Sequence, residues 1–389
     1  MKRQHYAGRD FRRAITIEDL RRVARRRLPN FSYEYIEGGA EDEVTLRRNR
    51  DVFEKITWQP RALVGAGPPD MGSEIFGKPV NLPIVIAPTG FNGLLWQQGD
   101  IALASAAREA GVPFTLSTAS NCSVARLAAA VQGNHWYQLY AYKDQSVVDR
   151  LTDHVREAGC AVLVITADAP VLGAREWDQR NYSAPMQLSL ASKLDVLRHP
   201  GWLARIMFPS GAPTFENLTE FLPPGKYSAL IGAKYSFSQI NSRLSWRDVE
   251  RIRARWPGKL VVKGVLCIED ARRAAEAGCD GVVLSNHGGR QLDTCVSGVE
   301  LLPAVASELR DRLTVLVDGG FRRGSDVLKA IALGAHGVMI GRAALYGLAA
   351  GGEAGVRHAI GILRTEMERT MLLLGCGSIP ELGRHLIRT

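Results

Sequence analysis

The sequence predicts a (β/α)8 TIM barrel, because short apolar runs recur along it at the spacing of one strand and one helix. Eight such runs begin 30, 23, 25, 98, 22, 32 and 23 residues apart, and six of these seven intervals fit one strand-helix unit. The runs are continuous in Val, Ile and Leu, as in parallel strands that are buried on both faces. Eight units favour a closed barrel over an open doubly wound sheet, which would show GxGxxG after an early strand.

The predicted elements alternate strictly after residue 82. We expect strands at 83–87, 113–117, 136–140, 161–166, 259–263, 281–285, 313–317 and 336–340. Amphipathic helices are expected between them, among others at 100–110, 123–131, 145–158, 268–277 and 325–333. The interval of 98 residues contains an insertion after the fourth strand, at about residues 181–245. With a helical N-terminal lead, the prediction is a single domain over residues 1–389.

Composition excludes several classes of protein. The chain has 389 residues, is 46% hydrophobic and contains no apolar run long enough to span a bilayer as a helix. Its start is basic but lacks the apolar core of a secretory signal. The six cysteines form no CxxC or zinc-type spacing, so we expect free thiols and no metal. Of the net charge of +9, residues 1–30 contribute +7, which argues against a nucleic-acid-binding fold.

Polar residues crowd the carboxyl ends of the predicted strands, where barrels place their chemistry. The last two ends read Asp318-Gly-Gly-Phe-Arg-Arg-Gly and Gly341-Arg342, and each precedes a helix N-terminus. Backbone N–H groups and guanidinium groups at such positions predict a phosphate site, on a cofactor or on a phosphorylated substrate. A solvated Gly-rich turn is the structural alternative.

His287 ends the sixth strand and Arg290 follows three residues later, which suggests a base beside a carboxylate-binding group. Asp168 after the fourth strand could stabilise the imidazolium, or could act only as a structural cap. Lys263 at the fifth strand could face developing negative charge, or could belong to a buried ion pair.

Several segments together resemble one family. These are YEYIEGGAEDE, the APTG turn, YQLYAYKD, LGAREWDQRN, SNHGGRQLD, VDGGFRRGSDVLKAIALGA and IGR, in family order from about residue 16 to residue 375. They are similar to the FMN-dependent L-2-hydroxy-acid oxidase/dehydrogenase family, and most similar to its membrane-associated, mandelate-oxidising members. A phosphate-binding isomerase or aldolase barrel would share the last two loops but not SNHGGRQLD together with YEYIEGGAEDE.

The resemblance implies FMN as cofactor and a role for each matching position. His287 would be the base, Asp168 its partner, Tyr140 the group on the substrate hydroxyl, and Lys263 the cation near the flavin. The substrate would contact Tyr35, Tyr140, Arg175, Arg290 and Gly90. The cofactor would contact Ala87, Thr89, Ser117, Gln138, Thr166, Lys263, Ser285, Asp318, Gly320, Arg322, Gly341 and Arg342. Whether a proton or a hydride leaves the α-carbon stays open.

Two positions bear on the substrate. Glycolate-oxidising members have Trp after the second strand, where this chain reads Ser117-Thr-Ala-Ser120, and Ala where it has Gly90. The smaller side chains leave room for a group larger than methyl, so we expect an aromatic 2-hydroxy acid. A lactate dehydrogenase or an oxygen-using oxidase is the alternative.

The insertion contains Leu, Trp, Ile, Met and Phe among basic residues between Lys193 and Phe208. Such a segment fits an anchor on an anionic membrane surface or a lid over the site. The resemblance favours a cytoplasmic enzyme attached to the inner membrane's cytoplasmic face, with quinone rather than oxygen as acceptor. It also implies a homotetramer.

Overall fold

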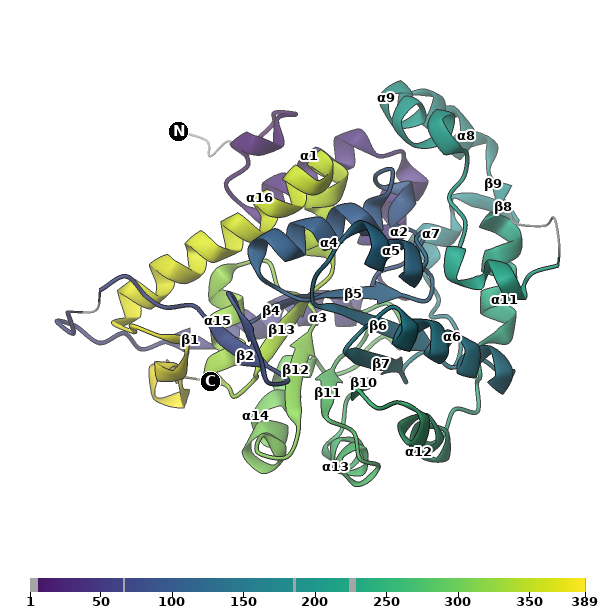
Figure 1. Ribbon diagram of the computed structural model, residues 1–389. Helices are drawn as coiled ribbons and strands as arrows, with labels where there is room; N and C mark the ends of the chain where they lie inside the picture. Colours follow the sequence, from purple (N-terminus) through teal and green to yellow (C-terminus); the bar gives the residue numbers. More distant parts are fainter. Residues whose placement is uncertain (1–5, 66, 185–186, 224–228, 389) are drawn as a thin grey trace.

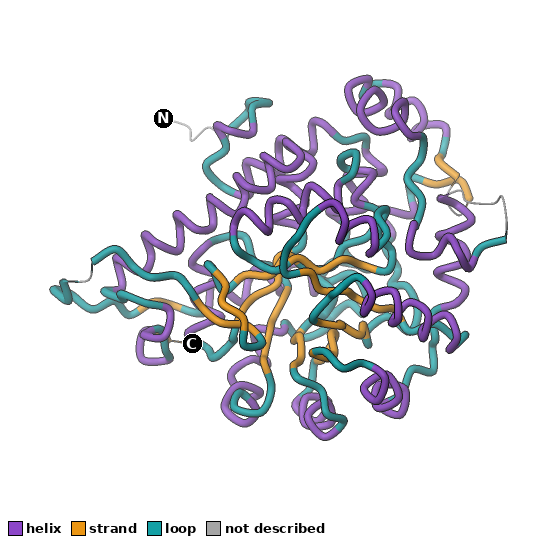
Figure 2. The backbone as a smooth tube through the Cα atoms, in the orientation of Figure 1, coloured by secondary structure: helices purple, strands orange, loops and turns teal. Residues whose placement is uncertain are grey.

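A computed structural model describes residues 6–65, 67–184, 187–223 and 229–388 of the chain. Within these residues eight parallel strands form a closed barrel in the order β10-β11-β12-β13-β4-β5-β6-β7. Figure 2 shows the strands gathered at the centre of the molecule with helices around them. The predicted (β/α)8 barrel is therefore confirmed. The barrel strands are β4 (Ile84–Ile86), β5 (Phe114–Ser117), β6 (His135–Tyr140), β7 (Val162–Thr166), β10 (Lys259–Val265), β11 (Gly281–Leu284), β12 (Thr314–Asp318) and β13 (Gly337–Ile340).

Helices follow the strands along the chain and cover the outside of the barrel (Figure 1). Each of the five expected helices is present, and no observed boundary differs from the expected one by more than one residue. Their caps agree with the sequence: Ser123 and Ser297 accept hydrogen bonds from the first turns of α5 and α14. The helices are α4 (Gly99–Ala110), α5 (Val124–Ala130), α6 (Gln145–Glu157), α12 (Trp246–Arg255), α13 (Ile268–Glu276), α14 (Gly298–Leu309), α15 (Gly324–Ala332) and α16 (Arg342–Leu374).

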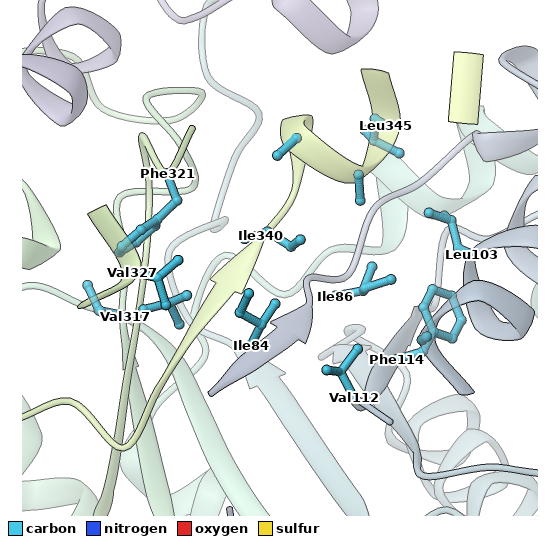
Figure 3. Close-up of a cluster of buried hydrophobic side chains, with 14 of the residues drawn as sticks. Ile84, Ile86, Leu103, Val112, Phe114, Val317, Phe321, Val327, Ile340 and Leu345 are labelled. Carbon is cyan, nitrogen blue, oxygen red and sulfur yellow. The ribbon is translucent and has the colours of Figure 1, made fainter. Parts of the chain in front are cut away.

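The alternation of side chains along each strand divides the core into two layers. Val85 and Met339 point into the barrel and belong to a small inner cluster. Ile84 and Ile86 belong to the larger outer cluster, which packs the strands against helices through residues such as Leu103 (Figure 3). A hairpin of β2 (Ser73–Ile75) and β3 (Lys78–Val80) adds Ile75 and Val80 to the inner cluster, so the barrel is filled rather than hollow.

The strand register brings the functional ends of neighbouring strands to one level. Tyr140 of β6 and Lys263 of β10 are both paired with Thr166 of β7. Ser117 of β5 is paired in turn with Gln138 of β6. Because parallel strands share one carboxyl end, these side chains meet at one rim of the barrel.

The N-terminal lead packs against the last helix and reaches the same rim. It contains η1 (Phe11–Arg13), α1 (Ile17–Arg27), α2 (Asn30–Glu37) and α3 (Val44–Lys55). A capping box at Thr16 begins α1, which lies beside α16 (Figure 1). Glu37 at the end of α2 accepts hydrogen bonds from Arg21 and from the Tyr346 hydroxyl, which fixes α2 on the barrel. After α3, β1 (Thr57–Trp58) pairs with β14 (Ile387–Arg388) near the C-terminus.

Most of the chain between β7 and α12 forms a group of elements at the right of Figure 1, with α8 and α9 at the upper right. Residues 185–186 and 224–228 of the predicted insertion lie outside the described residues. The described elements are α7 (Glu176–Gln179), β8 (Tyr182–Ala184), β9 (Gln187–Leu188), α8 (Leu190–Leu197), α9 (Pro200–Trp202), the π-helical η3 (Leu203–Met207), α10 (Phe208–Ser210), η4 (Glu216–Phe221) and α11 (Ala229–Gln239).

The insertion has an outer and an inner face. Leu194 and Leu197 of α8 are 51% and 66% exposed, and Leu190 and Phe208 are also exposed. Trp202 instead is buried and donates a hydrogen bond to the Leu94 carbonyl oxygen at 2.8 Å. The apolar segment is therefore only partly available to an external surface. No helix in the described part of the chain is long and apolar enough to cross a bilayer.

Candidate active site

A cavity at the carboxyl end of the barrel brings together most of the predicted site residues. Two of the predicted residues, Asp168 and Ser285, do not line the cavity, but they hydrogen-bond to His287 and Lys263, which do. The predicted residues that line the cavity are Tyr35, Ala87, Thr89, Gly90, Ser117, Gln138, Tyr140, Thr166, Arg175, Lys263, His287, Arg290, Asp318, Gly320, Arg322, Gly341 and Arg342.

His287 is held in one orientation. Its Nδ1 lies 3.0 Å from Asp168 Oδ1, so the imidazole donates from Nδ1 and leaves Nε2 as the acceptor. The backbone of His287 has φ of 58°, an uncommon conformation for a non-glycine residue, and its N–H donates to Ser285 Oγ at 3.0 Å. Functional residues are often held in such strained conformations by their surroundings.

His287 and Asp168 together have the charge distribution that a general base requires. Burial is the main cause that lowers the pKa of His287 below its usual 6.5, and Asp168 only partly offsets it. Burial alone would raise the pKa of Asp168, but the charges of His287 and Lys263, together with the hydrogen bond to His287, lower it below its usual value. At neutral pH the site therefore contains a neutral imidazole beside an ionised carboxylate.

Asp168 can approach because a glycine interrupts β10. The register between β10 and β11 shifts between Lys263 and Val265, and Gly264 at this bulge has φ of 105°. A Cβ on Gly264 would lie 2.6 Å from Asp168 Cβ. The bulge thus places the carboxylate against the end of β10 and beside Lys263.

Lys263 is a buried cation at the floor of the cavity. Its Nζ lies 3.1 Å from Asp318 Oδ2 and donates to Ser285 Oγ at 2.7 Å. Burial alone would lower its pKa, but Asp318 and Asp168 raise it above the usual value. Lys263 therefore belongs to a buried ion pair, the structural alternative of the sequence analysis. It also keeps its positive charge where it lines the cavity.

Four arginines, Arg175, Arg290, Arg322 and Arg342, also line the cavity. Arg290 donates to the Gly38 carbonyl oxygen at 2.7 Å and lies over the Tyr35 ring, and Arg175 Nε donates to the Arg290 carbonyl oxygen at 3.3 Å. Burial, followed by repulsion from Arg175 and Arg342, lowers the pKa of Arg290 to about 9. A group of partly buried cations that repel one another is a site for anions.

Arg342 has a role that the sequence did not reveal. Its guanidinium donates to three backbone carbonyl oxygens, those of Ile36, Gly288 and Gly38, at 2.8 to 3.0 Å. Arg342 therefore ties the end of α2 to the loop after β11. This connection brings Tyr35 of the N-terminal lead over the barrel.

The remaining cavity wall fits FMN. Ser117 Oγ donates to Gln138 Oε1 and Gln138 Nε2 donates to Thr166 Oγ1, which fixes a row of polar groups across three strands. Asp318 Oδ1 is buried and has no hydrogen-bond partner within the described protein, as expected of an acceptor for a ligand hydroxyl. Helix α16 begins at Arg342, and no side chain caps its first backbone N–H groups. Uncapped N–H groups at a helix N-terminus favour the binding of a phosphate.

Aromatic residues that the sequence analysis did not single out form the outer wall. Phe91 meets Tyr35 edge to face with ring centroids 5.6 Å apart, and packs against the tilted ring of Phe215 at 4.3 Å. Phe215 and Phe237 come from the insertion, so part of the insertion lines the cavity, although no residue of the apolar segment 193–208 does so. Their spacing in sequence gives no signal for this role, because the contact is made only by folding.

Comparison with known proteins agrees with this geometry. The FMN-dependent dehydrogenase family model matches residues 24–389. The chain belongs to this family. It is 42% identical to (S)-mandelate dehydrogenase of Pseudomonas putida, over 95% of this chain and 92% of that protein. It is 38% identical to an L-lactate dehydrogenase of Chromohalobacter salexigens, over 95% and 94% of the two chains.

A Mycobacterium tuberculosis protein, provisionally assigned as an L-lactate dehydrogenase, shares 44% identity over 96% of this chain and 89% of that protein. The crystal structure of the monotopic membrane protein (S)-mandelate dehydrogenase superposes with a TM-score of 0.92 at 41% identity, covering 97% of this chain and 99% of that chain. FMN-dependent oxidation of a 2-hydroxy acid is thus the activity of the family, and its relatives differ in the acid they oxidise.

Proposed function

We propose that the protein oxidises an aromatic (S)-2-hydroxy acid of the mandelate type to the 2-oxo acid and passes the electrons to a membrane quinone. The observation that carries this proposal is the placement of His287, oriented by Asp168 so that Nε2 can accept a proton, and of Arg175 and Arg290 in one cavity. One group accepts a proton and the others bind a carboxylate, as a 2-hydroxy acid requires.

The residues divide the reaction between them. The substrate carboxylate is bound by Arg290, Arg175 and Tyr35, and the substrate hydroxyl accepts a hydrogen bond from Tyr140. Burial raises the pKa of Tyr35 to about 12 and also raises that of Tyr140, so both tyrosines stay protonated and can donate. His287 Nε2 takes the proton, from the hydroxyl or from the α-carbon, and Asp168 stabilises the imidazolium.

FMN, when bound, accepts the two electrons that leave the substrate. Lys263 keeps a positive charge at the cavity floor, where negative charge develops. The residues that would hold FMN are Ala87, Thr89, Ser117, Gln138, Thr166, Lys263, Asp318, Gly320, Arg322, Gly341 and Arg342. Ser285 does not line the cavity and would act through its hydrogen bond to Lys263.

Small residues and aromatic rings support an aromatic substrate. A Cβ added to Gly90 would lie 3.1 Å from Ala119 Cβ and 3.3 Å from the Tyr35 hydroxyl, so larger residues here would take up space in the cavity. Phe91, Phe215 and Phe237 offer rings against which a phenyl group can pack. L-Lactate is the second candidate, favoured by the 44% identity to the mycobacterial protein.

The test is kcat/KM for (S)-mandelate and L-lactate with the FMN-loaded enzyme. We expect mandelate to be preferred, and a tenfold preference for lactate would overturn the aromatic substrate. Ala119→Trp should lower kcat/KM for mandelate by roughly tenfold and that for glycolate by less, because the indole would occupy the space of the phenyl group. Equal effects on both acids would contradict the role of Ala119 in specificity.

We place the protein peripherally on the cytoplasmic face of the inner membrane, and the exposed leucines of α8 support attachment to a membrane surface. At that surface a quinone is the acceptor within reach, whereas an oxygen-using oxidase needs no membrane. Steady-state turnover with a ubiquinone analogue under anaerobic conditions distinguishes the two. Turnover that requires oxygen would identify an oxidase.

We also propose a homotetramer. Leu63, Leu372 and Leu373 are exposed near the C-terminal end of α16, where a Cβ on Gly375 would touch Val64. An apolar patch of this kind on a folded chain is typical of an interface. Multi-angle light scattering should give four times the chain mass, and a monomer would contradict this proposal.

A further inference from the structure

The loop after β7 and the loop after β11 are joined by one buried side chain, that of Gln291. Its amide nitrogen donates to the carbonyl oxygens of Asp168 at 2.9 Å and Val171 at 2.8 Å. Its amide oxygen accepts from Gly173 N at 3.1 Å and lies 3.4 Å from an Arg175 guanidinium nitrogen. Gln291 is 8% exposed. A single amide thus contacts four positions along residues 168–175.

Residues 167–175 have no helix or strand to hold them, although they contain two groups that the reaction needs. Asp168 orients His287 at one end, and Arg175 lines the cavity at the other. The distance between the base and this carboxylate-binding group is therefore set by loop contacts. Small displacements at such a position cost catalysis heavily, because the reacting atoms must stay aligned.

The two loops also touch directly at Gly173. A Cβ there would lie 2.3 Å from the Arg290 carbonyl oxygen and 2.6 Å from that of Gln291, so the backbones are in contact. Only an amide can donate to two carbonyl oxygens and accept from an N–H group at the same time. Asn has the same group but one methylene less, so it could not span these contacts.

We propose that Gln291 is a positioning residue that sets the distance between the His287–Asp168 pair and Arg175. It acts through those residues and does not touch the substrate. This inference rests on the proposed function, since it assigns Arg175 to the substrate carboxylate and His287 to the proton.

The test is Gln291→Met, which keeps the size of the side chain and removes all four contacts. Asn217→Leu is the matched control. Asn217 is also 8% exposed, donates to the carbonyl oxygens of Ser117 and Cys122, and accepts from Val124 N. Both variants lose a buried amide that holds a loop after a barrel strand, but Asn217 contacts neither Asp168 nor Arg175.

In FMN-loaded Gln291→Met we expect kcat for (S)-mandelate to fall at least tenfold and KM to rise about tenfold. The calorimetric Kd for phenylglyoxylate, the 2-oxo acid product, should rise with KM. The acidic limb of the kcat/KM profile should move to lower pH, because His287 loses an aligned Asp168 that raises its pKa. Asn217→Leu should lower Tm comparably and keep the wild-type KM, Kd and acidic limb.

The inference is overturned if Gln291→Met keeps the wild-type KM, Kd and acidic limb, or changes them only as Asn217→Leu does. Wild-type protein that carries FMN but oxidises no 2-hydroxy acid would overturn the proposed function instead. The two failures are thus distinguished by the wild-type assay.

Discussion

The loop after β11 and the insertion after β7 both follow barrel strands, but they are built in opposite ways. The β11 loop buries Ser285, Asn286, Gln291, Asp293 and Ser297, each with hydrogen-bond partners. The insertion exposes a row of leucines. The difference indicates that the chemistry depends on a short, polar, internally bonded loop, whereas the insertion supplies cover on one face and an apolar surface on the other.

The strongest test of the polar loop is His287→Gln. We expect kcat/KM to fall by about 10³-fold, since the general base is removed while the surrounding loop stays bonded. The measurement is the rate of flavin bleaching by substrate in stopped flow. An unchanged FMN spectrum and Tm should show that the fold is retained, and a loss smaller than tenfold would contradict the assignment of the base.

Arg290→Met tests the anion site that the same loop supplies. We expect KM for the 2-hydroxy acid to rise about 100-fold, because a carboxylate would lose a buried guanidinium partner. Arg290→Lys should recover only part of this loss, since an ammonium cannot replace the fork geometry. Because Arg290 is repelled by Arg175 and Arg342, Tm should not fall; a lower Tm with unchanged KM would make Arg290 structural instead.

The pH dependence follows from the direction of the His287 shift. Its pKa is lowered below 6.5 and the neutral form is the active one, so kcat/KM should be level from pH 6.5 until Arg290, whose pKa is lowered to about 9, begins to lose its charge. It should decrease about tenfold per pH unit once the pH falls below the lowered pKa. An acidic limb above pH 6.5 would contradict a buried, neutral base.

The smallest effect on catalysis is expected from the insertion. The double variant Leu194→Ser, Leu197→Ser should reduce binding to anionic phospholipid vesicles about tenfold, because two exposed apolar side chains are lost. Its kcat/KM should equal that of the wild type. The control is Leu372→Ser, Leu373→Ser, two residues that are 45% and 71% exposed at the end of α16.

The control pair should weaken the oligomer and leave vesicle binding unchanged. If instead both pairs reduce vesicle binding equally, the α8 surface has no special part in attachment. The prediction also limits a deletion: the outward-facing side chains of Leu190, Leu194, Leu197 and Phe208 can be replaced without loss of activity. Trp202 is buried against the Leu94 carbonyl oxygen, and Phe215 and Phe237 line the cavity, so these residues must stay.

Much of the molecule could be predicted from the sequence because the relevant signals are local. Continuous apolar runs identified all eight strands, and parallel pairing then required Tyr140, Thr166 and Lys263 to meet at one rim. His287, Arg290 and the two glycine-rich loops could be recognised for the same reason, since each directly follows a strand.

Only the tertiary structure determined how distant segments complete the site. Tyr35 reaches the cavity because Arg342 binds the carbonyl oxygens at the end of α2, and Phe215 does so because the insertion folds back over the rim. The apolar segment 194–208 also looked uniform in sequence, yet Trp202 turned inward while Leu194 and Leu197 stayed outside. Such contacts join residues far apart in the chain, and no local pattern of hydrophobicity or turns encodes which partner a side chain will meet.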